Sequence, residues 1–162
     1  MLRYRSIILA LTFSVMRIPQ TYTSFQKTTA LVIVTDEHEA IFYSLHDGEI
    51  TRKTSCRVDQ PKYSDREDFG RRGSLVYESG ARFESKKRLI KQDFLKAFKA
   101  AAQSVAAGAE KIFLFCPDDL VTLLQKILLA SIGSKTSRVI KGNFYKKKPL
   151  ELLALLTAQG RG

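Results

Sequence analysis

The sequence has few cysteines and lacks the motifs of several common enzyme classes. Its two cysteines, Cys56 and Cys116, are 60 residues apart, which fits neither a disulfide framework nor a zinc-binding pattern. No Walker A loop, H-E-x-x-H pair or G-x-S-x-G nucleophile motif occurs. We therefore expect a reducing, cytoplasmic location and no small-molecule cofactor, and the sequence favours a binding protein over an enzyme.

Long hydrophobic runs are also absent, and glycine and proline are scarce. There are 9 glycines and 4 prolines among 162 residues, so the chain is not of low complexity and its length suits one domain. The apolar run at residues 7–16 is too short to span a bilayer as a helix, and we expect no membrane span.

Residues 1–26 form a leader that differs from the rest of the chain. Basic residues precede the apolar run, as in a signal peptide, but no A-x-A-like cleavage site follows. An alternative is that translation starts at Met16. We expect residues 1–26 to lie outside the folded core and residues 27–162 to form a single domain.

Acidic residues are outnumbered, and the excess of positive charge is uneven. The chain has 27 Lys and Arg against 16 Asp and Glu, and residues 51–100 alone carry 14 basic and 7 acidic groups. A basic middle favours an anionic partner, with RNA or the ribosome as the first candidate. The alternative is a solvated face of a basic protein.

The hydrophobic pattern predicts an α/β fold. Residues 29–36 have the composition of a buried strand, and residues 40–45 and 49–56 should pair as a hairpin around Asp47-Gly48. Apolar residues from Leu89 to Val105 recur at helical spacing, with Lys87, Lys91, Lys96 and Lys99 on the opposite face.

The C-terminal third alternates strand and helix signals. Residues 111–117 predict a strand, and Asp118 or Asp119 should cap a helix that ends at Gly133. Residues 137–145 predict a further strand, and Pro149 opens a last helix. The fold class is therefore a mixed β-sheet with an N-terminal β-hairpin, followed by alternating helices and strands, the later strands being parallel.

Residues 57–85 show neither the helical nor the strand periodicity of apolar residues, and they are predicted to form a long basic loop. Loops of this length inside a domain are often functional, although a disordered insertion is an alternative. Aromatic residues alternate with arginines here, a combination that stacks on bases and binds phosphate. The alternative is that Phe69 and Tyr77 anchor the loop to the core. The candidate RNA-binding residues are Arg66, Arg71, Arg72, Gly73, Ser74, Arg82, Lys86 and Lys87.

A second candidate site follows the first strand. Asp36 with Glu39, His38 or His46 supplies ligands for a divalent cation, as a metal-dependent nuclease with an RNase H-like outline would need. The competing interpretation, which we favour, is a polar turn in which Asp36 bonds its own backbone.

The order of these segments resembles the bacterial host attachment protein family, which is similar to the middle domain of eukaryotic class I release factors and of Pelota. The resemblance covers about residues 29–158. It rests on ALVIVTDEHEAIFYSLHDGEI, FESKKRLIKQDFLKAFKAAA, KIFLFCPDDLVTLLQKIL and SRVIKGNFYKKKPLELLALL.

The resemblance implies a role for the basic loop. In release factors the corresponding loop carries a Gly-Gly-Gln tip that positions a water at the peptidyl-tRNA ester. Here Gly73 matches a tip glycine, Arg72 replaces the other, and Ser74 stands where the Gln would be. The resemblance therefore implies ribosome or RNA binding without peptidyl-tRNA hydrolysis. A second implication is an accessory role in host attachment or surface association, with an unknown partner.

Overall fold

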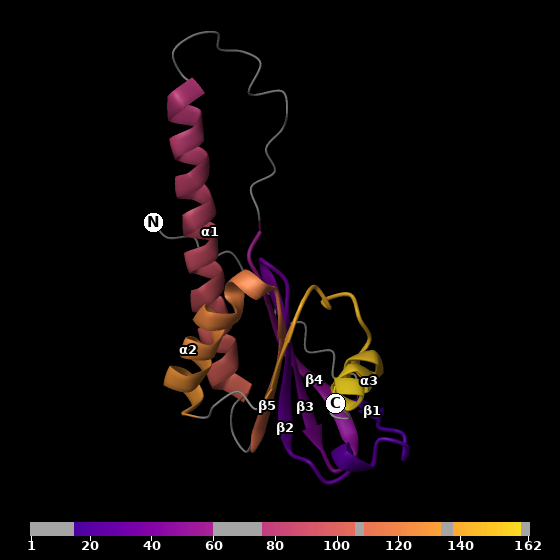
Figure 1. The fold of residues 1–162 in the computed structure, drawn as a ribbon. Helices are drawn as coiled ribbons and strands as arrows, with labels where there is room; N and C mark the ends of the chain where they lie inside the picture. Colours follow the sequence, from indigo (N-terminus) through magenta and orange to yellow (C-terminus); the bar gives the residue numbers. More distant parts are fainter. Residues whose placement is uncertain (1–14, 60–75, 106–108, 134–137, 160–162) are drawn as a thin grey trace.

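The computed structural model describes residues 15–59, 76–105, 109–133 and 138–159, and shows a mixed sheet between two layers of helices (Figure 1). Within these residues the sheet has six strands in the order β1-β4-β3-β2-β5-β6. Taken in that order, the strands are β1 (Val15–Arg17), β4 (Glu49–Arg57), β3 (Glu39–His46), β2 (Ala30–Thr35), β5 (Lys111–Cys116) and β6 (Arg138–Lys141).

The strand directions confirm the predicted α/β class. β2 is antiparallel to β3 and parallel to β5, and β5 is parallel to β6. The hairpin between β3 and β4 turns at Asp47 and Gly48, whose φ angles are 49° and 74°. Positive φ at both central residues is the type I′ geometry that Asp-Gly favours, which explains why this dipeptide marks the hairpin.

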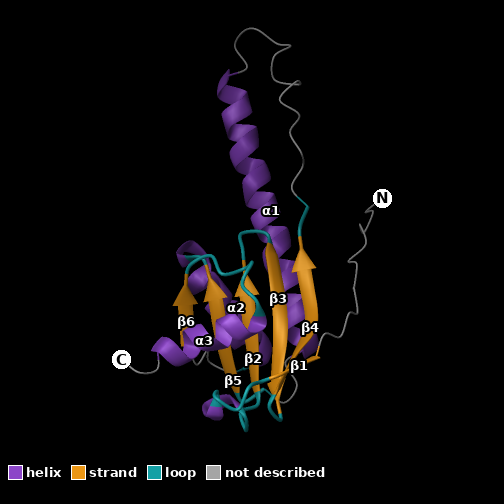
Figure 2. Cartoon of the chain, turned by 90° about the vertical axis from the view of Figure 1, so that its right-hand side faces the viewer, coloured by secondary structure: helices purple, strands orange, loops and turns teal. Residues whose placement is uncertain are grey.

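The helices cover both faces of the sheet (Figures 1 and 2). Helices α1 (Val76–Val105) and α2 (Val121–Ile132) lie on one face, and α3 (Pro149–Gln159) lies on the other. Each layer has its own apolar core. Phe94, Phe98, Leu124 and Leu128 are fully buried on the first face, and Leu152, Leu153 and Leu156 are buried on the second.

The prediction that residues 1–26 lie outside the core is wrong for residues 15–26. β1 pairs with β4, and the backbone N–H of Ile18 donates to the carbonyl of Gly48 at 2.7 Å. Ile18 and Phe25, the latter in the short helix η1 (Thr23–Phe25), are buried in the core beneath α3. A three-residue edge strand has too short a pattern to reveal itself in a sequence. Residues 1–14 lie outside the described residues.

One predicted helix boundary and one predicted strand boundary also change. Gly133 ends α2 in the left-handed conformation and Pro149 opens α3, both as expected. Neither Asp118 nor Asp119 caps α2, because both belong to a short helix, η3 (Asp118–Leu120), that precedes α2. The N-cap residue of α2 is Leu120, which makes no side-chain hydrogen bond to the helix. Asp118 instead pairs with Lys141 at 2.9 Å. β6 is shorter than predicted, ending at Lys141.

Candidate functional site

The N-terminal part of α1 extends beyond the sheet and the other helices (Figures 1 and 2). We call residues 76–93 the projecting segment and residues 94–105 the packed segment. At 1.5 Å per residue, the projecting segment is about 27 Å long. Every described side chain from 85 to 93 is exposed except Ile90, whereas Phe94 and Phe98 are fully buried. The helix therefore leaves the domain within about one turn of Phe94.

This projection corrects the predicted loop. Residues 76–85, predicted as the end of a basic loop, are the first turns of α1. The sequence showed no helical period there, and a helix without an apolar stripe is hard to recognise from sequence alone. The stripe was also predicted to begin at Leu89, but that side chain is 58% exposed. It lies on the side of the helix away from Phe94 and Phe98.

The basic side chains of α1 were predicted to lie on the face opposite the core, and for Lys87 and Lys91 this is wrong. Lys87 and Lys91 precede Phe94 and Phe98 by seven residues, close to two full turns. They therefore continue the line of the two buried phenylalanines along the helix. Lys87 and Lys91 are exposed only because the helix has already left the domain.

Basic side chains outnumber acidic ones in the part of the projecting segment whose side chains the structure describes. Residues 85–93 carry Lys86, Lys87, Arg88 and Lys91 against a single acid, Asp93. Within the described ranges, no carboxylate lies within ion-pair distance of Arg88 or Lys91. Like charges one turn apart repel by a few tenths of a kcal/mol per pair. An anion bound here would relieve that repulsion.

The end of the sheet beneath the projecting segment has a different charge balance. Arg57, at the end of β4, has its Nε 3.6 Å from Glu39 Oε1 and 3.7 Å from Asp59 Oδ1. Burial raises the pKa of Tyr145, and a hydrogen bond to Glu39 and the charge of that carboxylate raise it further. The cation at the base of α1 is thus paired with two carboxylates.

The structure places the predicted site residues in two groups. Arg82, Lys86 and Lys87 belong to α1, where Lys86 and Lys87 are exposed and the side chain of Arg82 is outside the described part. Arg66, Arg71, Arg72, Gly73 and Ser74 lie outside the described residues. Arg88 and Lys91 join the exposed basic group, although neither was singled out as an RNA-binding residue. A count of charge along residues 85–93 would have found them.

The predicted metal site does not assemble as a whole. Asp36 forms a polar turn, in which its Oδ1 accepts from the N–H of Glu37 at 2.8 Å and its own N–H donates to the carbonyl of Glu39 at 2.8 Å. His46 ends β3, whereas Asp36 and His38 precede that strand, so His46 lies a strand length away. Among the described residues, no group of three or more His, Cys, Asp and Glu side chains is placed to hold a metal ion.

The fold and the exposed helix define an α/β protein with a projecting basic arm. The sequence matches no family model and no curated protein. Within the described residues, no helix combines the length and apolar character needed to cross a bilayer.

Proposed function

We propose that the projecting segment of α1, together with the adjoining basic residues 57–75, binds the phosphate backbone of RNA, including ribosomal RNA. The observation that carries the proposal is the exposure of Lys87 and Lys91 at positions on the helix that continue the buried line of Phe94 and Phe98. A helix that merely extended the domain would carry apolar residues at those positions and pack them.

The charge of the segment supports a backbone-directed mode of binding. Lysine ammonium groups act as point charges toward phosphate and do not read base edges, so binding should tolerate changes of sequence. A helix of this length presents its cations at about 1.5 Å per residue, which allows several phosphates to be contacted at once. The affinity should therefore depend steeply on salt.

The proposal includes binding without peptidyl-tRNA hydrolysis. It draws on the resemblance to release-factor middle domains, in which the Gln of the tip orders the reacting water, whereas this chain has Ser74. Misplacing a reacting water by about an ångström can lower a rate about a hundredfold. Purified protein in excess should therefore not release labelled peptide from stalled ribosomes. Release that is lost in Ser74→Ala would contradict this part of the proposal.

The binding experiment compares two matched double variants. Lys87→Gln/Lys91→Gln removes two charges from the projecting segment, and Lys27→Gln/Lys126→Gln removes two exposed charges elsewhere. Fluorescence anisotropy with a labelled single-stranded RNA is measured between about 50 and 200 mM salt, the range over which phosphate contacts are distinguished. We expect the first variant to reduce the slope of log K against log salt by about two units and the second to leave it nearly unchanged.

Sedimentation with ribosomes at low and high salt extends the test to the particle. The parent protein should sediment with ribosomes at low salt and be released at high salt, and Lys87→Gln/Lys91→Gln should sediment less at both. Equal RNA affinity and equal salt slopes for the two double variants would rule out the projecting segment as the binding surface.

A further inference from the structure

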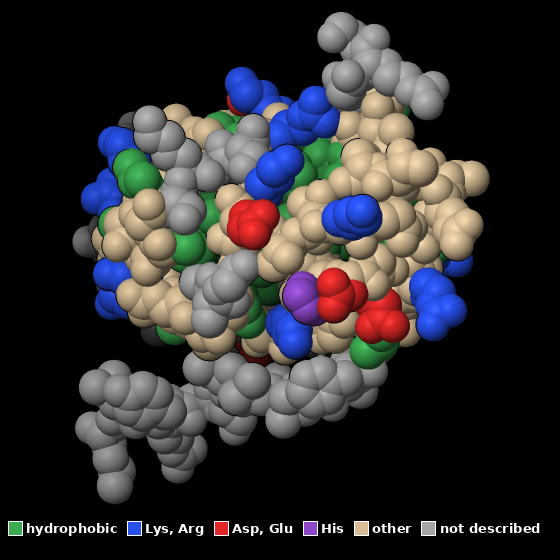
Figure 3. Space-filling view, turned by 90° about the horizontal axis from the view of Figure 1, so that it is seen from below, with side chains coloured by type: hydrophobic (Ala, Val, Ile, Leu, Met, Phe, Trp, Pro, Cys, Tyr) green, Lys and Arg blue, Asp and Glu red, His purple; other side chains and the backbone are tan. Residues whose placement is uncertain are grey.

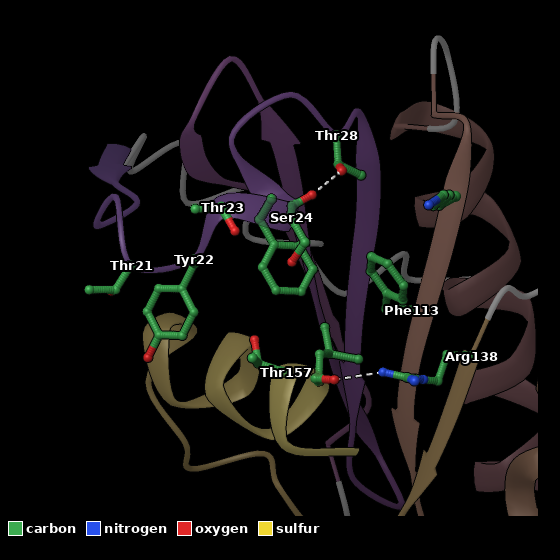
Figure 4. A pocket seen from close by; sticks show the side chains of 11 residues that line it. Thr21, Tyr22, Thr23, Ser24, Thr28, Phe113, Arg138 and Thr157 are labelled. Carbon is green, nitrogen blue, oxygen red and sulfur yellow. Dashed lines mark hydrogen bonds between the residues drawn. The ribbon is translucent and has the colours of Figure 1, made fainter. Parts of the chain in front are cut away.

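A cavity of about 550 Å³ lies far from the projecting segment, at the end of the sheet where β5 and β6 begin (Figure 4). One wall is the segment that follows β1 and carries Thr21, Thr23 and Ser24. The other wall comes from α3 and β6, with Thr157 and Arg138. This volume is in the range of small-molecule sites. Viewed from below, this end of the molecule shows hydrophobic side chains among charges of both signs (Figure 3).

The walls of the cavity are fixed by bonds that do not involve a ligand. Gln26 Nε2 donates to the carbonyls of Ile18 and Pro19, at 3.1 and 2.9 Å, and Thr28 Oγ1 donates to the carbonyl of Ser24 at 2.6 Å. Phe25 packs edge-to-face on Phe113, with ring centroids 6.1 Å apart. The segment from β1 to β2 is therefore held against the sheet, and the cavity is preformed.

Two cations share this cavity without a carboxylate partner. Lys111 and Phe113 are two residues apart on β5, so they face the same side of the sheet, and Arg138 is the register partner of Phe113 on β6. Within the described ranges, no acidic group lies within ion-pair distance of Lys111 or Arg138. Two neighbouring positive charges on one face repel each other unless an anion lies between them.

Arg138 retains donors for such an anion. Its Nη1 donates to the carbonyl of Leu156 at 2.6 Å, near the C-terminal end of α3, and this bond holds the guanidinium in place. A guanidinium has five N–H donors, so most remain for a ligand. A forked arrangement of donors matches the oxygens of a phosphate group.

Hydroxyl side chains also line the cavity and can form hydrogen bonds with polar groups of a ligand. Thr157 Oγ1 donates to the carbonyl of Leu153 and is left as an acceptor. In the part of the chain that the structure describes, the hydroxyls of Thr21, Thr23 and Ser24 make no hydrogen bond, so each can donate and accept. The rings of Phe25 and Phe113, which are 6% and 8% exposed, also line the cavity and offer a ligand a small apolar contact area.

We propose that this cavity binds a phosphorylated sugar. The phosphate lies between Lys111 and Arg138, the sugar hydroxyls bond Thr21, Thr23 and Ser24, and an apolar face of the sugar ring lies on Phe25 and Phe113. A simple inorganic anion would use the cations but leave the hydroxyls without partners. An uncharged sugar would leave the repulsion between the cations in place. The site is independent of the proposed RNA-binding surface.

The test is an NMR titration of the ¹⁵N-labelled full chain with ribose 5-phosphate, ribose and inorganic phosphate. We expect ribose 5-phosphate to shift the backbone amides of residues 21–25, 111–113 and 157 in a saturable way. Ribose and inorganic phosphate should each bind at least about tenfold more weakly, because each lacks one of the two sets of contacts. Equal affinity for phosphate and ribose 5-phosphate would overturn the sugar part of the proposal.

Matched variants locate the site. Lys111→Gln removes one cation from the cavity, and Lys126→Gln removes an exposed cation from α2 on the other face of the sheet. We expect Lys111→Gln to weaken binding of ribose 5-phosphate about tenfold and Lys126→Gln to leave it unchanged. Ser24→Leu should abolish binding by filling the cavity, while the remaining amide signals keep their positions.

The results that would contradict this proposed sugar-phosphate site differ from those that would contradict RNA binding. If Lys111→Gln and Lys126→Gln bind ribose 5-phosphate equally well, or if the shifts spread over residues 85–93, the ligand binds by general charge attraction and the site is wrong. An absence of shifts at residues 21–25 at saturating ligand would also overturn it. Lys87→Gln/Lys91→Gln should leave this titration unaffected whether or not it weakens RNA binding.

Discussion

The two parts of α1 belong to one continuous helix but differ in what surrounds them. In the packed segment, Phe94, Phe98 and Ala102 are fully buried against the sheet and α2. In the projecting segment, Lys87 and Lys91 continue the same line and meet solvent. Burial stabilises the first part. The second is an extension whose helical form depends on the turns that follow it, since short helices without packing are marginal in water.

Under the proposed function, the two parts of this helix have different roles, the packed segment in stability and the projecting segment in binding. Substitutions in the packed segment should alter the free energy of unfolding. Substitutions in the projecting segment should alter binding and local helicity. Substitutions on either side of the division between Asp93 and Phe94 should show how sharp it is.

Among side-chain truncations, the largest effect is expected for Phe98→Ala. Phe98 is fully buried, and its ring lies 5.3 Å from that of Phe42 and 6.1 Å from that of Phe94, measured between centroids. Truncation should lower the free energy of unfolding by about 3–5 kcal/mol. Urea denaturation measures the change. A loss below about 1 kcal/mol, the size expected of a surface change, would contradict the burial of the packed segment.

The core beneath the packed segment should also respond to alkaline pH. Burial raises the pKa of Cys56, whose ordinary value is 9.0, to about 12, and a backbone hydrogen bond from Ala40 offsets part of the rise. The thiol contributes stability fully below pH 9, and that contribution is lost as the pH rises toward 12. Cys56→Ala should therefore lose less stability than the parent between pH 9 and 11. Denaturation curves that fall equally with pH in both proteins would contradict this.

A proline in the projecting segment should have a small effect on global stability. Proline costs about 3 kcal/mol in a helix interior, but Lys87 lies in a stretch, residues 85–89, whose side chains are all exposed. Far-UV circular dichroism should show a loss of helix, while the free energy of unfolding changes by less than about 1 kcal/mol, as for a surface substitution. Ala102→Pro is the matched change in the packed segment and should prevent folding.

The smallest effect is expected for Leu89→Ala. Leu89 is exposed on the side of the helix away from Phe94 and Phe98, and surface substitutions usually change stability by less than about 0.5 kcal/mol. The same denaturation assay measures it. A loss of 2 kcal/mol or more, the size typical of a buried leucine, would show that the projecting segment packs against something in solution.

Much of the fold could be predicted, because its main signals are local. The Asp47-Gly48 turn, the apolar runs of β2 and β5, Gly133 and Pro149 each act within a few residues. The start of α1 could not be predicted, because residues 76–85 show no helical periodicity of apolar residues, which is the signal that sequence reasoning depends on. β1 was missed because its three residues are defined by a partner more than thirty positions away.

The two candidate sites also differ in whether the local sequence reveals them. The basic surface of α1 follows from charge along one stretch of sequence, so Lys86 and Lys87 could be named in advance. The cavity joins Thr21, Lys111, Arg138 and Thr157, which come together only through strand order and register. No local pattern connects these positions, and a sequence alone does not indicate that they meet.

The short outer strands have a consequence for self-association. Within the described residues β1 pairs only with Glu49–Thr51, which leaves the rest of β4 as an outer edge. A register shift opposite Phe42 and Tyr43 leaves Lys53 without a pairing partner, and Arg52 and Arg57 flank it. Irregular edges that carry positive charge are poor templates for another strand, because like charges meet when two copies approach. The edge that ends below the projecting segment therefore disfavours pairing of the sheets of two copies, and the effect should weaken as salt screens the charges.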